Sequence, residues 1–109
     1  MKEIKAIIRQ DRLSVVLQAL HAMPGLPGVT ISTVRGSGRR HPPEGTEHVF
    51  DDVEMTKLEI VVPAAMAADV VGAIERSAHT GRVGDGKIFV IPVEHAVKVR
   101  SGERDGSAL

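Results

Sequence analysis

The stretch "AIIRQDRLSVVLQAL", residues 6–20, has a second, altered copy in "IVVPAAMAADVVGAI", residues 60–74. A shift of 54 residues superposes apolar positions of the two copies: Ile8 on Val62, Val16 on Val70, Leu17 on Val71, Ala19 on Ala73 and Leu20 on Ile74. Each copy opens with apolar residues typical of a strand and continues with apolar residues at helical spacing. The chain is therefore predicted to contain two strand–helix–strand units.

The flanking segments complete the predicted order, strand–helix–strand–strand–helix–strand. Both "VTISTVR" (29–35) and "TKLEIVV" (56–62) have the composition of strands, and "IFVIPVEHAVKVR" (88–100) is predicted to be extended. Right-handed crossovers fold this order as a ferredoxin-like α+β sandwich, an antiparallel sheet with two helices on one face. We expect a single domain over residues 1–109.

Glycine and proline mark the ends of the helices and the position of a loop. The helices are expected over residues 13–23, where "PGLPG" follows, and from 63 through 74, with proline in the first turn. Residues 36–55 carry three glycines, two prolines and many charges, which predicts a long loop. The polar end, "SGERDGSAL" (101–109), is predicted to be mobile.

The face of the sheet opposite the helices is predicted to be partly apolar. Period-two alternation places five residues there: Ile7, Val34, Val61, Phe89 and Ile91. A lone sandwich would leave this face in water, so we expect another subunit to cover it. The alternative is a register shifted by one residue.

Composition limits the classes of function. Apolar residues make up 42% of the chain, but Trp and Tyr are absent and Phe occurs twice, so the core must be aliphatic. The absence of cysteine fits a reducing compartment, the first residues do not resemble a signal peptide, and we expect a cytoplasmic protein. Zero formal net charge and the lack of exposed aromatics argue against nucleic acid as a partner.

A glycine-rich segment resembles a phosphate-binding loop. Gly81 is followed after four residues by Gly86 and Lys87, but Ile88 stands where a P-loop has Ser or Thr. The order is also inverted, because a helix precedes the segment and a strand follows it. With Gly84, the glycines can still expose main-chain N–H groups to an anion beside Lys87. The alternative is a plain helix-to-strand turn with a solvated lysine.

Two other basic segments point to the same chemistry. One is "RGSGRR" (35–40), and the other places Lys98 and Arg100 on one face of an extended segment. Three basic, glycine-flanked segments in a neutral chain predict a convergent site for a polyanion. Scattered solvated cations are the alternative.

These residues also carry a family resemblance that covers nearly the whole chain. The segment "TGRVGDGKIFV" (80–90) is similar to the B-loop of the PII signal-transduction proteins, the nitrogen-regulatory family. The segments "VKVRSGERDGSAL" (97–109), "KLEIVVP" (57–63) and "MKEIKAII" (1–8) resemble other parts of that family.

The resemblance implies a regulatory binding protein with no catalytic residues and no enzyme activity. It implies a ferredoxin-like homotrimer that binds ATP, ADP or AMP in clefts between subunits. Residues 37–55 would be the T-loop, which docks on a membrane transporter or a cytosolic enzyme. The B-loop would span residues 80–87 and the C-terminal segment residues 98–109.

The resemblance also assigns site residues to this sequence. The phosphates would be held by Gly84, Asp85, Gly86, Lys87 and Arg39, with Lys98 and Arg100 from the neighbouring subunit. Adenine and ribose would lie against Ile7, Val29, Thr30, Gly36, Ser37, Gly38 and Val61. Most of the family has arginine at the position of Lys98. The ammonium group of lysine there replaces a guanidinium, which can make two parallel hydrogen bonds to one phosphate.

Several residues of this sequence differ from the family at positions that decide which signals the protein responds to. The T-loop is shorter, and His48 stands at the position of the uridylylated tyrosine. Arg40 replaces the glutamine that helps bind magnesium and 2-oxoglutarate, and Met55 replaces the lysine that grips 2-oxoglutarate. We therefore expect 2-oxoglutarate to strengthen the binding of magnesium and ATP little or not at all. Similar divergent branches are linked to inorganic carbon or metal efflux, so nitrogen, carbon and metal homeostasis stay open, as do bicarbonate and magnesium as further ligands.

Two other functions are alternatives to this one. An acylphosphatase-like enzyme could use Arg12, but that chemistry also needs an asparagine, and the chain has none. A metal-binding sensor could use His41, His48, Asp51 and Asp52, although such residues in a polar loop are usually solvated. No metal ligand is therefore assigned.

Overall fold

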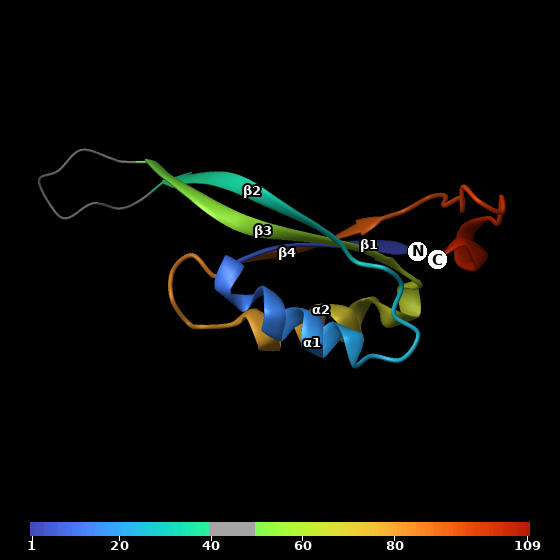
Figure 1. The fold of residues 1–109 in the computed structure, drawn as a ribbon, viewed down its shortest axis with the longest axis horizontal. Helices are drawn as coiled ribbons and strands as arrows, with labels where there is room; N and C mark the ends of the chain where they lie inside the picture. Colours follow the sequence, from blue (N-terminus) through green and yellow to red (C-terminus); the bar gives the residue numbers. More distant parts are fainter. Residues whose placement is uncertain (40–49) are drawn as a thin grey trace, which may run out of the picture.

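The computed structural model describes residues 1–39 and 50–109. Its longer elements are β1 (Lys2–Ile8), α1 (Leu13–His21), β2 (Thr30–Arg39), β3 (Phe50–Val62), α2 (Ala67–Ala78) and β4 (Gly86–Pro92). The strands form an antiparallel sheet in the order β2-β3-β1-β4, and both helices cover one face of it (Figure 1). The predicted ferredoxin-like sandwich is confirmed.

The core lies between the sheet and the helices, and it is aliphatic as predicted. In the pairing of β1 with β3, Ile4 lies opposite Ile60 and Ala6 opposite Leu58. Burial of a Leu, Ile or Val side chain contributes about 1.5–3 kcal/mol, so this layer dominates stability. The buried apolar residues are Ile4, Ala6, Ile8, Val16, Leu20, Leu58, Ile60, Val62, Val70, Ala73, Ile74 and Ala78.

The register also confirms the composition of the opposite, open face. Ile7 lies opposite Lys57 and Lys87, and Val34 lies opposite Met55, all on this side of the sheet. Phe89, with 45% of its surface exposed, shares the face. The expectation that a second subunit covers these residues stays a prediction.

The predicted loop over residues 36–55 is wrong at both of its ends. Strand β2 continues to Arg39 and β3 begins at Phe50, with Gly36 opposite Val53 and Ser37 opposite Asp52. The extended strands project beyond the helices (Figure 1). No core packs against this ribbon, so glycine and charged residues are tolerated there, and Arg35 pairs across the strands with Asp52.

The predictions for the C-terminal part also need correction. The extended segment ends at Pro92 as a strand of the sheet, and the tail predicted to be mobile forms a hairpin-like turn. Val97 pairs with Arg104, and the N–H of Gly102 donates to the carbonyl of Lys98 at 2.8 Å. A short 3-10 helix, Asp105–Ala108, follows. Main-chain bonds between the two arms of the turn fix a segment whose side chains are mostly polar.

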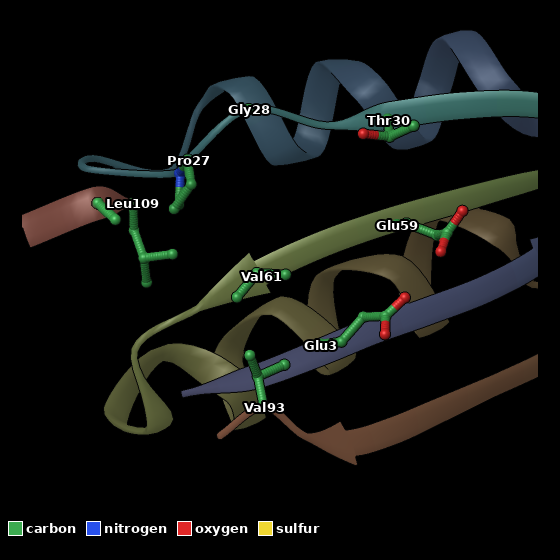
Figure 2. A pocket seen from close by; sticks show the side chains of 9 residues that line it. Glu3, Pro27, Gly28, Thr30, Glu59, Val61, Val93 and Leu109 are labelled. Atoms are coloured by element: carbon green, nitrogen blue, oxygen red, sulfur yellow. The ribbon is translucent and has the colours of Figure 1, made fainter. Parts of the chain in front are cut away.

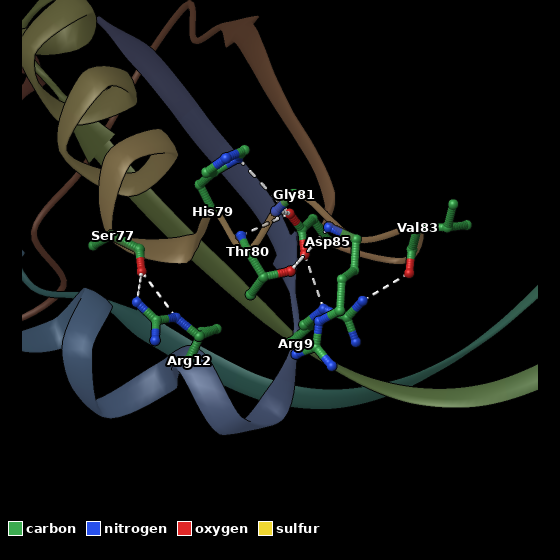
Figure 3. Close-up of polar contacts among 9 residues, drawn as sticks. Arg9, Arg12, Ser77, His79, Thr80, Gly81, Val83 and Asp85 are labelled. Atoms are coloured by element: carbon green, nitrogen blue, oxygen red, sulfur yellow. Dashed lines mark hydrogen bonds and ion pairs between the residues drawn. The ribbon is translucent and has the colours of Figure 1, made fainter.

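Arg12, the residue considered for acylphosphatase chemistry, is held at the C-terminal end of α2. Its Nε and Nη2 donate to the carbonyl of Ser77 at 3.0 and 2.6 Å (Figure 3). The last carbonyls of a helix lack intrahelical partners, and a cation there also interacts favourably with the helix dipole. The contact joins the start of the first structural unit to the end of the second helix.

We predict that Arg12→Ala lowers the free energy of unfolding by about 1–2 kcal/mol, because it removes this charged cap. Urea unfolding of the variant measures the loss. Arg76→Ala, which removes an exposed guanidinium from α2 itself, is the matched control. Equal stabilities of the two variants would show that the cap does not contribute.

No helix in residues 1–39 or 50–109 has the length and apolar character needed to cross a membrane.

Candidate functional site

The glycine-rich segment forms a tight loop between α2 and β4. Gly81, Gly84 and Gly86 have φ angles of +82°, +98° and +98°, a region that other residues rarely adopt. A Cβ atom at Gly86 would lie 1.7 Å from the carbonyl oxygen of Ile7. The loop therefore enters β4 in direct contact with the main chain of β1, and only glycine permits this approach.

Asp85 organises this loop from within. Its carboxylate accepts hydrogen bonds from the hydroxyl and N–H of Thr80 and from the N–H of Gly81, the last two at 2.8 and 2.9 Å (Figure 3). It also accepts one from Nε of Arg9 at 2.9 Å. The Thr80 hydroxyl, followed by Arg9, holds the pKa of Asp85 well below its usual range. This carboxylate faces the loop interior, so only the main chain of Asp85 is left to meet an anion.

Lys87 follows the loop as an exposed residue of β4, opposite Ile7. The same end of the sheet carries Gly36, Ser37 and Gly38 on β2, all exposed. A cavity of about 390 Å³ borders the loop, lined by Ile8, Val71, Glu75, Ala78, His79, Asp85, Gly86, Lys87 and Ile88. The glycine loop, Lys87 and the glycines of β2 form what we call the loop end of the protomer.

A second cavity, of about 550 Å³, lies at the opposite end of the sheet (Figure 2). Two predicted adenine-site residues, Thr30 and Val61, line it, whereas Val29 packs against the core instead. Its full lining is Glu3, Pro27, Gly28, Thr30, Glu59, Val61, Val93, Ala108 and Leu109. We call this region the terminal end, because both chain termini lie there (Figure 1).

Two carboxyl groups in this cavity were missed by the sequence analysis. Glu3 and Glu59 lie on neighbouring strands, and a hydrogen bond between them raises the pKa of Glu3 and lowers that of Glu59. Lys57 contacts Glu59 at 3.4 Å, from Nζ to Oε1. The register of β1 with β3, which places Glu3 opposite Val61 and so beside Glu59, was the signal that could have found them, but spacing along one segment does not give it.

The predicted cations of the C-terminal segment lie beyond this cavity. Lys98 is half-buried, with its Nζ 3.9 Å from Oε1 of Glu103, and Arg100 is exposed. The segment that carries them, residues 93–109, lies at the terminal end, far from the glycine loop (Figure 1). Strand β1 joins the two ends, and its seven residues span about 20 Å at the usual rise per residue. A single chain therefore does not bring the predicted phosphate ligands together.

Several residues considered from the sequence lie outside the described residues, namely Arg40, His41 and His48. Asp52 is described and pairs with Arg35 rather than with a metal-ligand group. Within residues 1–39 and 50–109, no three His, Asp or Glu side chains cluster in a way that could hold a metal ion. The structure of these segments therefore adds no support to the metal alternative.

The comparisons with known proteins agree with this fold. A family model, "Nitrogen regulatory protein P-II", matches residues 1–103. The chain is 42% identical to the nitrogen regulatory protein P-II of Azospirillum brasilense over 113 aligned positions that cover all of both chains. It is equally similar, over the same share of both chains, to nitrogen regulatory protein P-II 1 of Escherichia coli K12.

A solved structure supports the same conclusion. The crystal structure of Arabidopsis thaliana PII bound to citrate superposes with a TM-score of 0.83 at 40% sequence identity. The match covers 99% of this chain and 91% of that one. The relatives are named as regulators rather than as enzymes, in agreement with the predicted regulatory role. A family model that spans nearly the whole chain, full-length relatives and a shared fold together show that this chain belongs to the nitrogen regulatory protein P-II family.

Proposed function

We propose that this chain is a PII-like signal-transduction protein that binds ATP, ADP or AMP between the subunits of a homotrimer. In this proposal, the bound nucleotide controls the docking of a membrane transporter or cytosolic enzyme through residues 37–55. The pathway is one of nitrogen, inorganic-carbon or metal homeostasis.

The observation that carries the proposal is the separation of the two ends of the protomer. The loop end offers glycine main chain and Lys87, while the C-terminal segment that carries Lys98 and Arg100 lies at the terminal end (Figure 1). A ring in which the loop end of each subunit meets the terminal end of the next would complete every site. The same ring would cover the open face, where Phe89 on the edge strand β4 is 45% exposed.

The charges of the two ends support one direction for the nucleotide. Carboxylates of Glu3 and Glu59 in the terminal cavity repel phosphate and can accept hydrogen bonds from an amino group on a base (Figure 2). Main-chain N–H groups beside Lys87 suit a phosphate. The base would therefore lie in the terminal cavity of one subunit, with its phosphates on the loop end of the next.

Met55 bears on which second ligand is sensed. It lies half-buried in β3, opposite Val34, where a thioether cannot pair with a carboxylate. We propose that 2-oxoglutarate strengthens the binding of magnesium and ATP little or not at all. Bicarbonate and magnesium remain to be titrated as further ligands.

Light scattering and calorimetry test this function together. The expected results are a mass of about three chains, saturable binding of at least one adenine nucleotide and recovery of the bound ATP without hydrolysis. Addition of 2-oxoglutarate should leave the ATP isotherm unchanged. A monomer at micromolar concentration, or no heat from any of the three nucleotides, would contradict the proposal.

A further inference from the structure

A guanidinium–carboxylate contact holds the glycine loop to the end of β1. Arg9 donates from Nε to Oδ1 of Asp85 at 2.9 Å and from Nη2 to the carbonyl of Val83 at 2.7 Å (Figure 3). Asp85 in turn accepts hydrogen bonds from the N–H groups of Thr80 and Gly81. Both side chains are about three-quarters buried, with 23% and 24% exposed. Two charged residues thus join the start, the tip and the end of the loop.

A loop with three positive-φ glycines needs such contacts to keep one shape. Glycine loses more conformational freedom on ordering than any other residue, so an untethered loop would be ordered only when a ligand binds, at a cost in affinity. Gly84 lies directly beneath the arginine, because a Cβ there would be 3.4 Å from Nη2 of Arg9. The guanidinium therefore defines the path of the main chain at this glycine.

The hydrogen bonds also divide the loop into a tethered part and an exposed part. The N–H groups of Thr80 and Gly81 are bonded to Asp85, and that of Arg82 to the hydroxyl of Thr80 at 3.2 Å. Those three donors are not available to an anion. Any main-chain donor for a phosphate must come from the loop residues after Arg82. The direction of their N–H groups depends on the contacts that Asp85 and Arg9 make with the loop.

We propose that Arg9 and Asp85 are positioning residues, a latch that holds residues 80–86 in the shape that receives a polyphosphate. This inference rests on the proposed function. In it, Arg9 acts through the loop and not as a direct phosphate ligand, since Nε and Nη2 are both engaged within the protein. Asp85 improves the binding of an anion although its own charge repels one.

The direction in which one substitution changes ATP affinity distinguishes the latch from a simple effect of charge. Asp85→Asn removes a negative charge beside the phosphate site, so charge alone predicts tighter binding of ATP. The latch predicts weaker binding, by about ten-fold, because the amide cannot hold the guanidinium as a carboxylate does. Calorimetry measures the affinity of the variant for ATP and, separately, for adenosine. Adenosine affinity should stay within about two-fold, because adenosine lacks the phosphates that the loop would meet.

Matched variants complete the design. Asp69→Asn makes the same change of charge at an exposed residue of α2 and should leave ATP affinity unchanged. Arg9→Ala should resemble Asp85→Asn, and the double variant Arg9→Ala/Asp85→Asn should lose no more than either single one, because both break the same contact. Arg9→Lys keeps the charge but cannot donate to Asp85 and Val83 in the same forked geometry, so it should also weaken ATP binding.

Hydrogen exchange without nucleotide tests the latch independently. In the parent protein, the N–H groups of Thr80 and Gly81 should exchange slowly, and in Asp85→Asn and Arg9→Lys they should exchange at least about ten-fold faster. Unchanged exchange, or tighter ATP binding by Asp85→Asn, would overturn the latch. If the parent binds no nucleotide, the proposed function fails, and the exchange rates still decide whether the loop is held by these two residues.

Discussion

Replacement of Gly86 by alanine should destabilise the protein by about 3 kcal/mol or more, the largest loss of stability that we expect from a single methyl group. The new Cβ would lie 1.7 Å from the carbonyl oxygen of Ile7 and 2.8 Å from its carbon. Alanine would also have to adopt a φ of +98°. Neither atom of Ile7 can move without breaking the pairing of β1 with β4, so the clash cannot be relieved locally.

Urea unfolding measures this loss, and Gly106→Ala is the matched control. A Cβ atom added at Gly106 would meet nothing within 4 Å beyond its chain neighbours, and its φ is not positive, so this substitution should be nearly neutral. Similar unfolding midpoints for the two variants would show that the loop does not approach β1 as described. The position of Lys87, one residue later, depends on the same approach.

The second large effect is expected on binding. Lys87→Ala should weaken ATP and ADP binding by about 1.5–3 kcal/mol, roughly a ten- to hundred-fold change, because a charge-assisted contact to phosphate is lost. Calorimetry measures it. Arg82→Ala removes another exposed cation from the same loop and should change affinity by no more than about three-fold. Equal affinities of Lys87→Ala and the parent would remove Lys87 from the site.

The fold could be predicted because its pattern is local and repeated. Alternation in residues 2–8 and helical spacing in residues 13–21 are set by which side chains meet the core, and the second copy follows the same rule. The same alternation correctly placed Ile7 and Phe89 on the open face. These predictions need no knowledge of which strands are neighbours.

Apart from the C-terminal turn, the failures have the opposite cause, since they depend on pairing between residues that are distant in the sequence. The extension of β2 and β3 through Gly36 and Val53 is stabilised by the partner strand, against local turn signals. The approach of Glu3 to Glu59 requires the register of β1 with β3. The contact of Arg9 with Asp85 joins residues 76 positions apart. Composition and spacing along one segment carry no information on such contacts.

The central claim, that each site takes one half from each of two subunits, can be tested by mixing defective chains. Lys87→Ala impairs the loop end, and the double variant Lys98→Ala/Arg100→Ala impairs the terminal end. Trimers made of either chain alone should have no high-affinity site. In mixed trimers, one junction joins the intact loop end of one variant to the intact terminal end of the other.

Co-expression with two different affinity tags, purification on both tags and calorimetry with ATP give the number and affinity of these sites. We expect about one site per mixed trimer with the affinity of the parent protein. Mixed trimers that bind no better than the two defective parents would contradict a site shared between subunits.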